Sequence, residues 1–201
     1  MDSINNISYN RADRLPFQAH YMLSSIFVEC FFNSVKHLSK DKTLLRDVFQ
    51  HMFLPEFFYV AYCNNKIISM ASCTSEPSAI KFNVSEFHRV FGFISGSLKY
   101  RRLKKDMIST NSRFYTDKNI GRIEFVSTEP NYRKQGIATG LIRYILTDGG
   151  FQKYQLEVDR TNKDAYDIYS KLGFILIEEE IDSNYITMEL TPPKPQAKIY
   201  P

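Results

Sequence analysis

The 201-residue sequence contains no tryptophan, only three cysteines and only four histidines, and this scarcity excludes several classes of protein. Cys30, Cys63 and Cys73 form neither a CxxC pair nor an even-numbered framework, so they predict no zinc site and no disulfide scaffold. The histidines are scattered without a partner pattern, and we expect no metal site and no Ser–His–Asp triad. The unpaired thiols favour a reducing, cytoplasmic setting.

Long apolar runs are also missing. The most apolar early segment, residues 25–32, carries Glu29 and is far too short to span a bilayer. Residues 1–14 lack the apolar centre of a signal peptide. The net charge of +4 is too mild to predict a nucleic-acid partner. We therefore expect a cytoplasmic protein associated with neither a membrane nor a nucleic acid.

Apolar residues make up 43% of the chain and aromatic residues 14%, which is typical of a folded globular protein. The length suits a single domain over 1–201 that buries a substantial core. Two parts stand apart from the rest. Residues 74–121 are expected to form a helical insertion, and residues 191–201 contain four prolines, which predicts an extended tail.

The spacing of apolar residues predicts the order of elements in the first half. The expected elements are a strand at 3–9, helices at 13–35 and 40–52, and hairpin strands at 57–63 and 66–73. Ser39 or Asp41 is suited to cap the second helix, and Asn64-Asn65 to form the hairpin turn. Residues 84–107 are expected to be helical with a break near Gly92 or Gly96, followed by a polar loop at 109–119.

Residues 123–139 read as a strand, a short loop and the start of a helix. Pro130 and Asn131 end the strand, and apolar residues recur at helical spacing after Gly136. A tight loop that enters a helix brings unpaired backbone N–H groups together, and the helix dipole favours an anion there. Gly136 allows close approach and Arg133 adds positive charge. Taken alone, this stretch suits a phosphate-binding turn or a plain strand-to-helix connection.

A second stretch, residues 156–174, reads as strand, helix and strand, with Asn162 near the helix start and Gly173 at its end. Together the two stretches resemble the acetyl-CoA-binding core of the GNAT superfamily of N-acyltransferases. The residues that carry the resemblance are Arg133, Gly136, Ala138, Asn162, Ala165, Tyr169, Lys171, Gly173 and Phe174.

This resemblance implies an α/β fold: a mixed, mostly antiparallel sheet with a central splayed parallel strand pair, flanked by helices. The expected order of elements agrees, because the strand–helix–strand unit is followed by final strands at 174–181 and 185–190. The resemblance also implies that acetyl-CoA lies in the wedge between the parallel strands. Proteins of this family are often dimers, so a homodimer is expected.

The resemblance further assigns residues to that wedge. The loop and helix start would hold the pyrophosphate of acetyl-CoA, and the backbone of the preceding strand would contact the pantetheine arm. The cofactor-binding residues implied in this way are Val126, Ser127, Thr128, Arg133, Lys134, Gln135, Gly136, Ile137, Ala138, Thr139, Asn162 and Tyr169. A backbone N–H near Val126 would polarise the thioester carbonyl.

Two side chains are expected to carry the proton transfers. The resemblance places Tyr169 where many family members keep a general acid for the departing thiolate, the alternative being a core aromatic. Glu124 is expected to be the general base, because strand alternation would put it on the same face as Val126 and Thr128. The other candidates for the base are Asp159, Glu129 and solvent.

The sequence thus predicts an N-acetyltransferase in which a small-molecule or peptide amine directly attacks the bound thioester. A non-catalytic acyl-CoA sensor or scaffold is the alternative. A third hypothesis is nucleic-acid binding by the basic run Lys99–Lys105, for which a solvated helix face is the plainer interpretation. The acidic run Glu178–Glu180 would attract a cationic acceptor or form a solvated strand edge.

Overall fold

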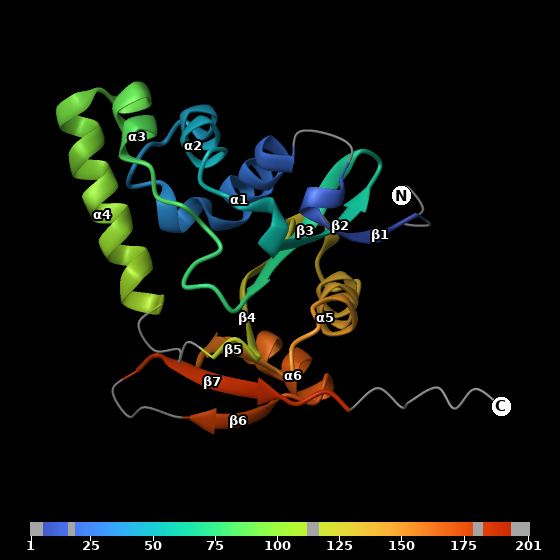
Figure 1. Cartoon of the computed structure of the whole chain (residues 1–201). Helices are drawn as coiled ribbons and strands as arrows, with labels where there is room; N and C mark the ends of the chain where they lie inside the picture. The colour runs from blue at the N-terminus through green and yellow to red at the C-terminus, as the bar shows by residue number, and fades with distance from the viewer. Residues whose placement is uncertain (1–5, 16–18, 112–116, 179–182, 194–201) are drawn as a thin grey trace.

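The computed structural model describes residues 6–15, 19–111, 117–178 and 183–193. Within these ranges one mixed sheet has the strand order β1-β2-β3-β4-β5-β7-β6, and β4–β5 is its parallel pair (Figure 1). The strands are β1 (Ser8–Arg11), β2 (Phe58–Cys63), β3 (Lys66–Thr74), β4 (Ile120–Thr128), β5 (Lys153–Asp159), β6 (Ile175–Glu178) and β7 (Tyr185–Leu190). The α-helices are α1 (Ala19–Val35), α2 (Lys42–Phe49), α3 (Val84–Phe91), α4 (Phe93–Asn111), α5 (Ile137–Asp148) and α6 (Lys163–Lys171). The predicted α/β fold is confirmed.

Local sequence signals placed several elements correctly. The hairpin turns at Asn64 and Asn65, whose φ angles of 48° and 59° are ones that asparagine tolerates. Asp41 caps α2, because its carboxylate accepts hydrogen bonds from the backbone N–H groups of Thr43 and Leu44. The break in the insertion is also confirmed, at Gly92, where φ is 78°.

Other boundaries were wrong. The first strand begins only at Ser8, and α1 begins at Ala19 after a separate helical turn at Ala12–Arg14. The helix predicted at 40–52 is shorter, and α4 continues through Asn111 into the segment predicted to be a loop. Helix ends are set by packing as well as by propensity, so single-residue signals locate them poorly. Predictions for residues 1–5, 16–18, 112–116, 179–182 and 194–201 lie outside the described residues. The single-domain organisation stays a prediction.

Each face of the sheet carries its own apolar core. On the face covered by α1 and α2, Phe27 and Phe58 belong to one buried cluster. On the face covered by α5, Leu141 and Ile145 join Ala71 of β3 in a second cluster. Burial of apolar surface on both faces is the main force that holds helices against the sheet. None of the described helices is both long and apolar enough to cross a membrane.

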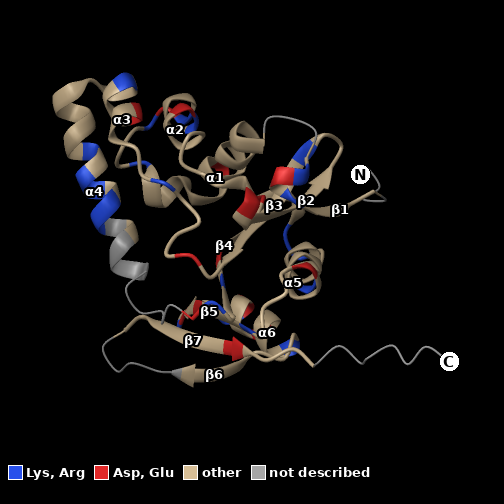
Figure 2. Cartoon of the chain, in the orientation of Figure 1, with Lys and Arg blue, Asp and Glu red and all other residues tan. Residues whose placement is uncertain are grey.

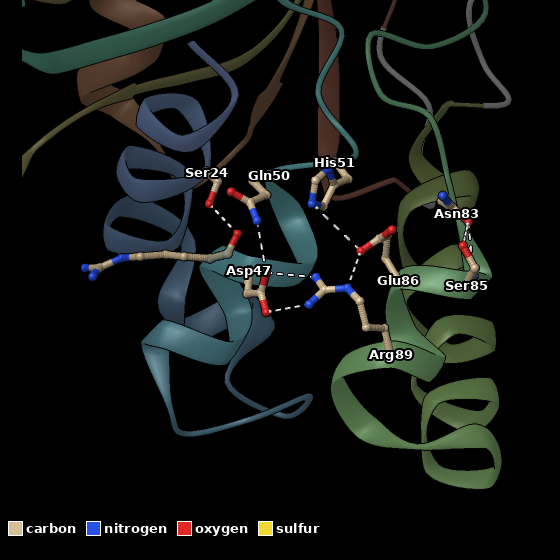
Figure 3. Close-up of polar contacts among 9 residues, drawn as sticks. Ser24, Asp47, Gln50, His51, Asn83, Ser85, Glu86 and Arg89 are labelled. Carbon is tan, nitrogen blue, oxygen red and sulfur yellow. Dashed lines mark hydrogen bonds and ion pairs between the residues drawn. The ribbon is translucent and has the colours of Figure 1, made fainter. Parts of the chain in front are cut away.

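The helices of the predicted insertion, α3 and α4, stand together beside α2 (Figure 1). Arg89 of α3 donates hydrogen bonds at 2.8 and 3.0 Å to the two carboxylate oxygens of Asp47 on α2, and its Nε donates to Glu86 (Figure 3). His51 lies 3.9 Å from Glu86 in the same network. A bidentate guanidinium–carboxylate pair fixes orientation as well as distance. The clamp therefore sets the position of α3, and with it α4, relative to α2.

The basic run Lys99–Lys105 lies in the middle of α4 and not at its end (Figure 2). Arg101, Arg102 and Lys105 are exposed. Lys99 instead turns inward, where its Nζ donates a hydrogen bond to the carbonyl oxygen of Leu38. The same ammonium lies 4.9 Å from the centre of the Phe91 ring. One lysine of the run therefore has a structural role, and the exposed members form a solvated helix face.

Gly96 is a point of close contact between α4 and α3. A Cβ added there would lie 2.4 Å from the backbone carbonyl oxygen of Phe87, so Gly96→Ala must push the two helices apart. We expect the free energy of unfolding, measured by urea denaturation, to fall by about 1–3 kcal/mol. Ser95→Ala, at the exposed neighbouring position, is the control and should change it by less than about 0.5 kcal/mol. Equal stabilities of the two variants would contradict this packing.

Candidate active site

The site forms where β4 and β5 separate. The two strands pair only from Ile120 with Lys153 to Ile123 with Leu156. Beyond these residues, no described strand pairs with this edge of β4, so the backbone groups of residues 124–128 are open on that side. The splayed parallel pair that the family resemblance implied is confirmed (Figure 1).

β4 is bulged at the point of separation. Phe125 has a φ of 56°, and it lies with Val126 opposite a single residue of β3, Ala71. An extra residue in one strand interrupts the alternation of faces. Phe125 packs with the α1 core, whereas Val126 packs with the α5 core. The prediction that alternation places Glu124 on the face of Val126 and Thr128 is therefore wrong, although Glu124 and Val126 line one cavity.

A groove of ≈ 730 Å³ runs between the end of β4, the loop into α5 and the length of α6, with two residues of α1 at its side. Of the residues predicted to bind the cofactor, it is lined by Val126, Ser127, Thr128, Arg133, Lys134, Gly136, Ile137, Ala138, Thr139, Asn162 and Tyr169. Gln135 is not among the lining residues, and its side-chain amide donates a hydrogen bond to the carbonyl oxygen of Asn131. The structure thus brings together two stretches that are separate in the sequence.

The loop into α5 has the backbone shape of an anion site. Lys134 and Gly136 both have left-handed conformations, with φ angles of 60° and 76°. No side chain caps the start of α5, so the first N–H groups of the helix are left without a side-chain partner beside the groove. Arg133 Nε donates a 3.0 Å hydrogen bond to the carbonyl oxygen of Thr128, which ties the loop to the end of β4.

Tyr169 of α6 borders the groove and a second cavity as well. The side chain is 7% exposed, and burial raises its pKa to about 12. No described residue makes a hydrogen bond to its hydroxyl group, so the phenol is protonated at neutral pH and free to donate. Asn162 lies near it as the predicted cap of α6, accepting a 3.1 Å hydrogen bond from the backbone N–H of Ala165.

The second cavity has a volume of ≈ 460 Å³ and lies between α1, α4, β4, β5 and β7. It shares Phe31, Val126, Asn162, Ala165 and Tyr169 with the groove. Sequence reasoning named no individual residue in the part of its lining that comes from α1, α4 and β7, which includes Phe27, Phe31, Leu103, Met107 and Tyr185. Their one sequence signal is apolar helical or strand periodicity, which ordinary core residues share.

The three candidate bases have different surroundings. Glu124 lines the second cavity; burial raises its pKa, and its buried Oε2 has no hydrogen-bond partner among the described residues. Asp159 lines the same cavity, but hydrogen bonds from Thr161 lower its pKa. Glu129 lies outside both cavities, and its carboxylate accepts a 2.6 Å hydrogen bond from Lys66. The Glu124 carboxylate has its pKa shifted towards neutrality, as a base requires.

The sequence that forms this site matches a known family. Residues 20–174 match the family model described as the acetyltransferase (GNAT) family. The chain belongs to the GNAT family. The GNAT chain also resembles a solved Pyrococcus horikoshii protein, PH1933, with 14% identity, a TM-score of 0.58, and coverage of 94% of this chain and 99% of that one.

A second solved structure, PaiA N-acetyltransferase from Thermoplasma acidophilum in complex with coenzyme A, has a TM-score of 0.52 and 14% identity over 93% of the GNAT chain and 99% of that protein. Among curated proteins, human N-alpha-acetyltransferase 30 is 34% identical over 58 residues, which are 27% of this chain and 16% of that one. Mouse alpha/beta-tubulin-N-acetyltransferase 9 is 27% identical over 86 residues, or 41% and 36% of the two chains. The chain thus aligns with well under half the length of either relative.

Replacing Glu124 by glutamine tests its burial. Because desolvation raises the pKa of this carboxyl, the folded protein binds its proton more tightly than the unfolded chain does. The stability contributed by this group is present below its ordinary pKa of 4.5 and is lost as the pH rises through the raised value. We expect Glu124→Gln to have a higher Tm than wild type at about pH 7, with the gain shrinking towards about pH 4. Glu56→Gln, at an exposed position, is the control. A gain that does not vary with pH would contradict the assignment.

Proposed function

We propose that the protein is an N-acetyltransferase that moves the acetyl group of acetyl-CoA to a primary amine within a ternary complex. The observation that carries this proposal is the meeting of two cavities at Tyr169, Val126 and Asn162. The groove offers the anion-binding loop, and the second cavity offers a buried carboxylate. Membership of the GNAT family supports acyl transfer, and the coenzyme A complex of the PaiA structure supports an acyl-CoA donor.

The residues present fit acetyl-CoA. The N–H groups at the start of α5 and the positive charges of Arg133 and Lys134 suit a pyrophosphate. The unpaired edge of β4 at residues 126–128 offers backbone groups to the amides of the pantetheine arm. Bound there, the cofactor supplies an acetyl thioester, whose carbonyl oxygen a backbone N–H of the bulge near Val126 would polarise.

Two side chains supply the proton transfers in this proposal. An ammonium group that enters the second cavity gives a proton to Glu124, which leaves a neutral amine able to attack the thioester carbon. A C–N bond forms as the C–S bond breaks, and the phenol of Tyr169 donates a proton to the sulfur. The proton that the nitrogen loses as it becomes an amide then restores the phenol. The net reaction converts an ammonium ion and a thioester into an amide, a thiol and one proton.

The oligomeric state of the protein stays a prediction. The free cysteines support a cytoplasmic location.

The loop can be tested with two glycines of matched geometry. Gly136 in the loop and Gly150 beyond the far end of α5 have φ angles of 76° and 71°, and neither has an atom within 4 Å of an added Cβ. Glutamate therefore strains both positions alike, but only at residue 136 does its charge face the groove. By calorimetric titration we expect Gly136→Glu to weaken acetyl-CoA binding at least about tenfold and Gly150→Glu to leave it within about twofold. Equal affinities would remove the loop from the cofactor site.

The proposed role of Tyr169 as general acid can be tested with a control variant on the same helix, α6. Tyr169→Phe removes the donor but keeps the buried ring, and we expect kcat to fall at least about tenfold in a thiol-release assay. Tyr166→Phe, three residues earlier on α6 and 39% exposed, should leave kcat unchanged. An unchanged rate in Tyr169→Phe would exclude this residue from the mechanism. Binding of acetyl-CoA without turnover of any amine by wild type would favour the non-catalytic sensor instead.

A further inference from the structure

The second cavity has a wall built by α4, a helix outside the stretches that carry the family resemblance. Leu103 and Met107, one helical turn apart, line it. Leu103 is almost fully buried, whereas Met107 is half-buried. Phe27 and Phe31 of α1 also line the cavity, with Phe125 of the bulge. The centres of these three rings lie 5.0 to 6.4 Å apart, so they form one aromatic surface.

The charged side chains that line the second cavity differ in whether they already have an interaction partner. Its described lining contains no lysine or arginine. The carboxylate of Asp159 is held in its own turn by the N–H and hydroxyl of Thr161, and Glu157 already has an interaction partner. Glu124 presents a buried oxygen that lacks a hydrogen-bond donor among the described residues. A buried carboxylate oxygen without a donor is unfavourable, and an ammonium group would supply one.

From this arrangement we infer that the acceptor is a primary amine with one positive charge on an apolar body, and that α4 helps to select it. This inference rests on the proposed function and names the substrate class for the same site. The ammonium group pairs with Glu124, and the body of the substrate packs between the aromatic surface of α1 and β4 and the Leu103–Met107 wall. A second cation on the acceptor would meet these apolar side chains and lose its hydration without a partner.

Two sources share this chemistry: a free alkyl or aryl amine, and a peptide whose first residue is large and apolar. A cavity of ≈ 460 Å³ lies within the usual range of pockets for small ligands and single residues. Both sources place one ammonium group on an apolar body. The class excludes polyamines and aminoglycosides, which carry further charges.

The test compares hexylamine with hexamethylenediamine, which has the same stem and one more ammonium group. With wild-type protein and acetyl-CoA, we expect kcat/KM in a thiol-release assay to be at least about tenfold higher for hexylamine. An equal or higher value for the diamine would overturn the inference. Methionyl and seryl tripeptide amides separate the two sources. A methionyl peptide that exceeds hexylamine indicates a peptide acceptor, and hexylamine that exceeds both peptides indicates a free amine. If both peptides exceed hexylamine and are used equally, an apolar body is contradicted.

The α4 wall is tested by a pair of variants on one helix. Met107→Ala should lower the ratio of kcat/KM for hexylamine to that for ethylamine by about tenfold, because ethylamine is too short to gain much from this wall. Leu98→Ala is the control: Leu98 lies on α4 but is 63% exposed and does not line the cavity, so the ratio should not change. The same ratio in Met107→Ala as in wild type would overturn the role of α4.

Failure of the proposed function would be recognisable separately. If the protein binds acetyl-CoA but none of the amines tested causes release of thiol, the proposal that it is an enzyme is wrong. Calorimetric titration of hexylamine and hexamethylenediamine into the acetyl-CoA-loaded protein then decides the inference about the cavity. Tighter binding of hexylamine that Met107→Ala weakens would support it, and equal or tighter binding of the diamine would overturn it.

Discussion

The separation of β4 from β5 after Ile123 is the constraint on which the rest of the site depends. Backbone N–H and C=O groups in the middle of a sheet are normally paired, and leaving them open is unfavourable unless water or a ligand satisfies them. Here the bulge at Phe125 turns β4 away from regular pairing. The left-handed backbone of this non-glycine residue is strained, and packing of its ring against Phe27, Phe31 and Phe58 holds it in place. The aromatic core of one face thus keeps the wedge open.

The two cavities beside the wedge differ in the charge they favour. The groove combines a helix N-terminus with Arg133 and Lys134, a combination that favours an anion. The second cavity contains the desolvated Glu124 carboxylate, which favours a cation. Tyr169 lies where the two meet, and burial raises its pKa further above neutrality. In the proposed reaction, reactants of opposite charge would approach from different sides and meet at this phenol.

The α3–α4 pair is attached to the rest of the chain by two contacts between helices. The Arg89–Asp47 clamp attaches α3 to α2 (Figure 3). Close contact at Gly96 attaches α4 to α3. Leu103 then reaches the core of α1 and α2 and the second cavity at once. These two contacts set where α4 stands beside the second cavity.

The sequence by itself determined the local features of this protein. It determined the Asn64-Asn65 turn, the caps at Asp41 and Asn162, and the glycine-bearing loop before α5, because each depends on conformational preferences within a few residues. The family resemblance added the splayed pair and most of the residues along the groove. Only the tertiary structure decided which way Glu124 faces, since the bulge breaks the alternation that the sequence suggested. It alone placed Leu103 and Met107 across from Phe27 and Phe31, because contacts between distant segments leave no local signal beyond apolar periodicity.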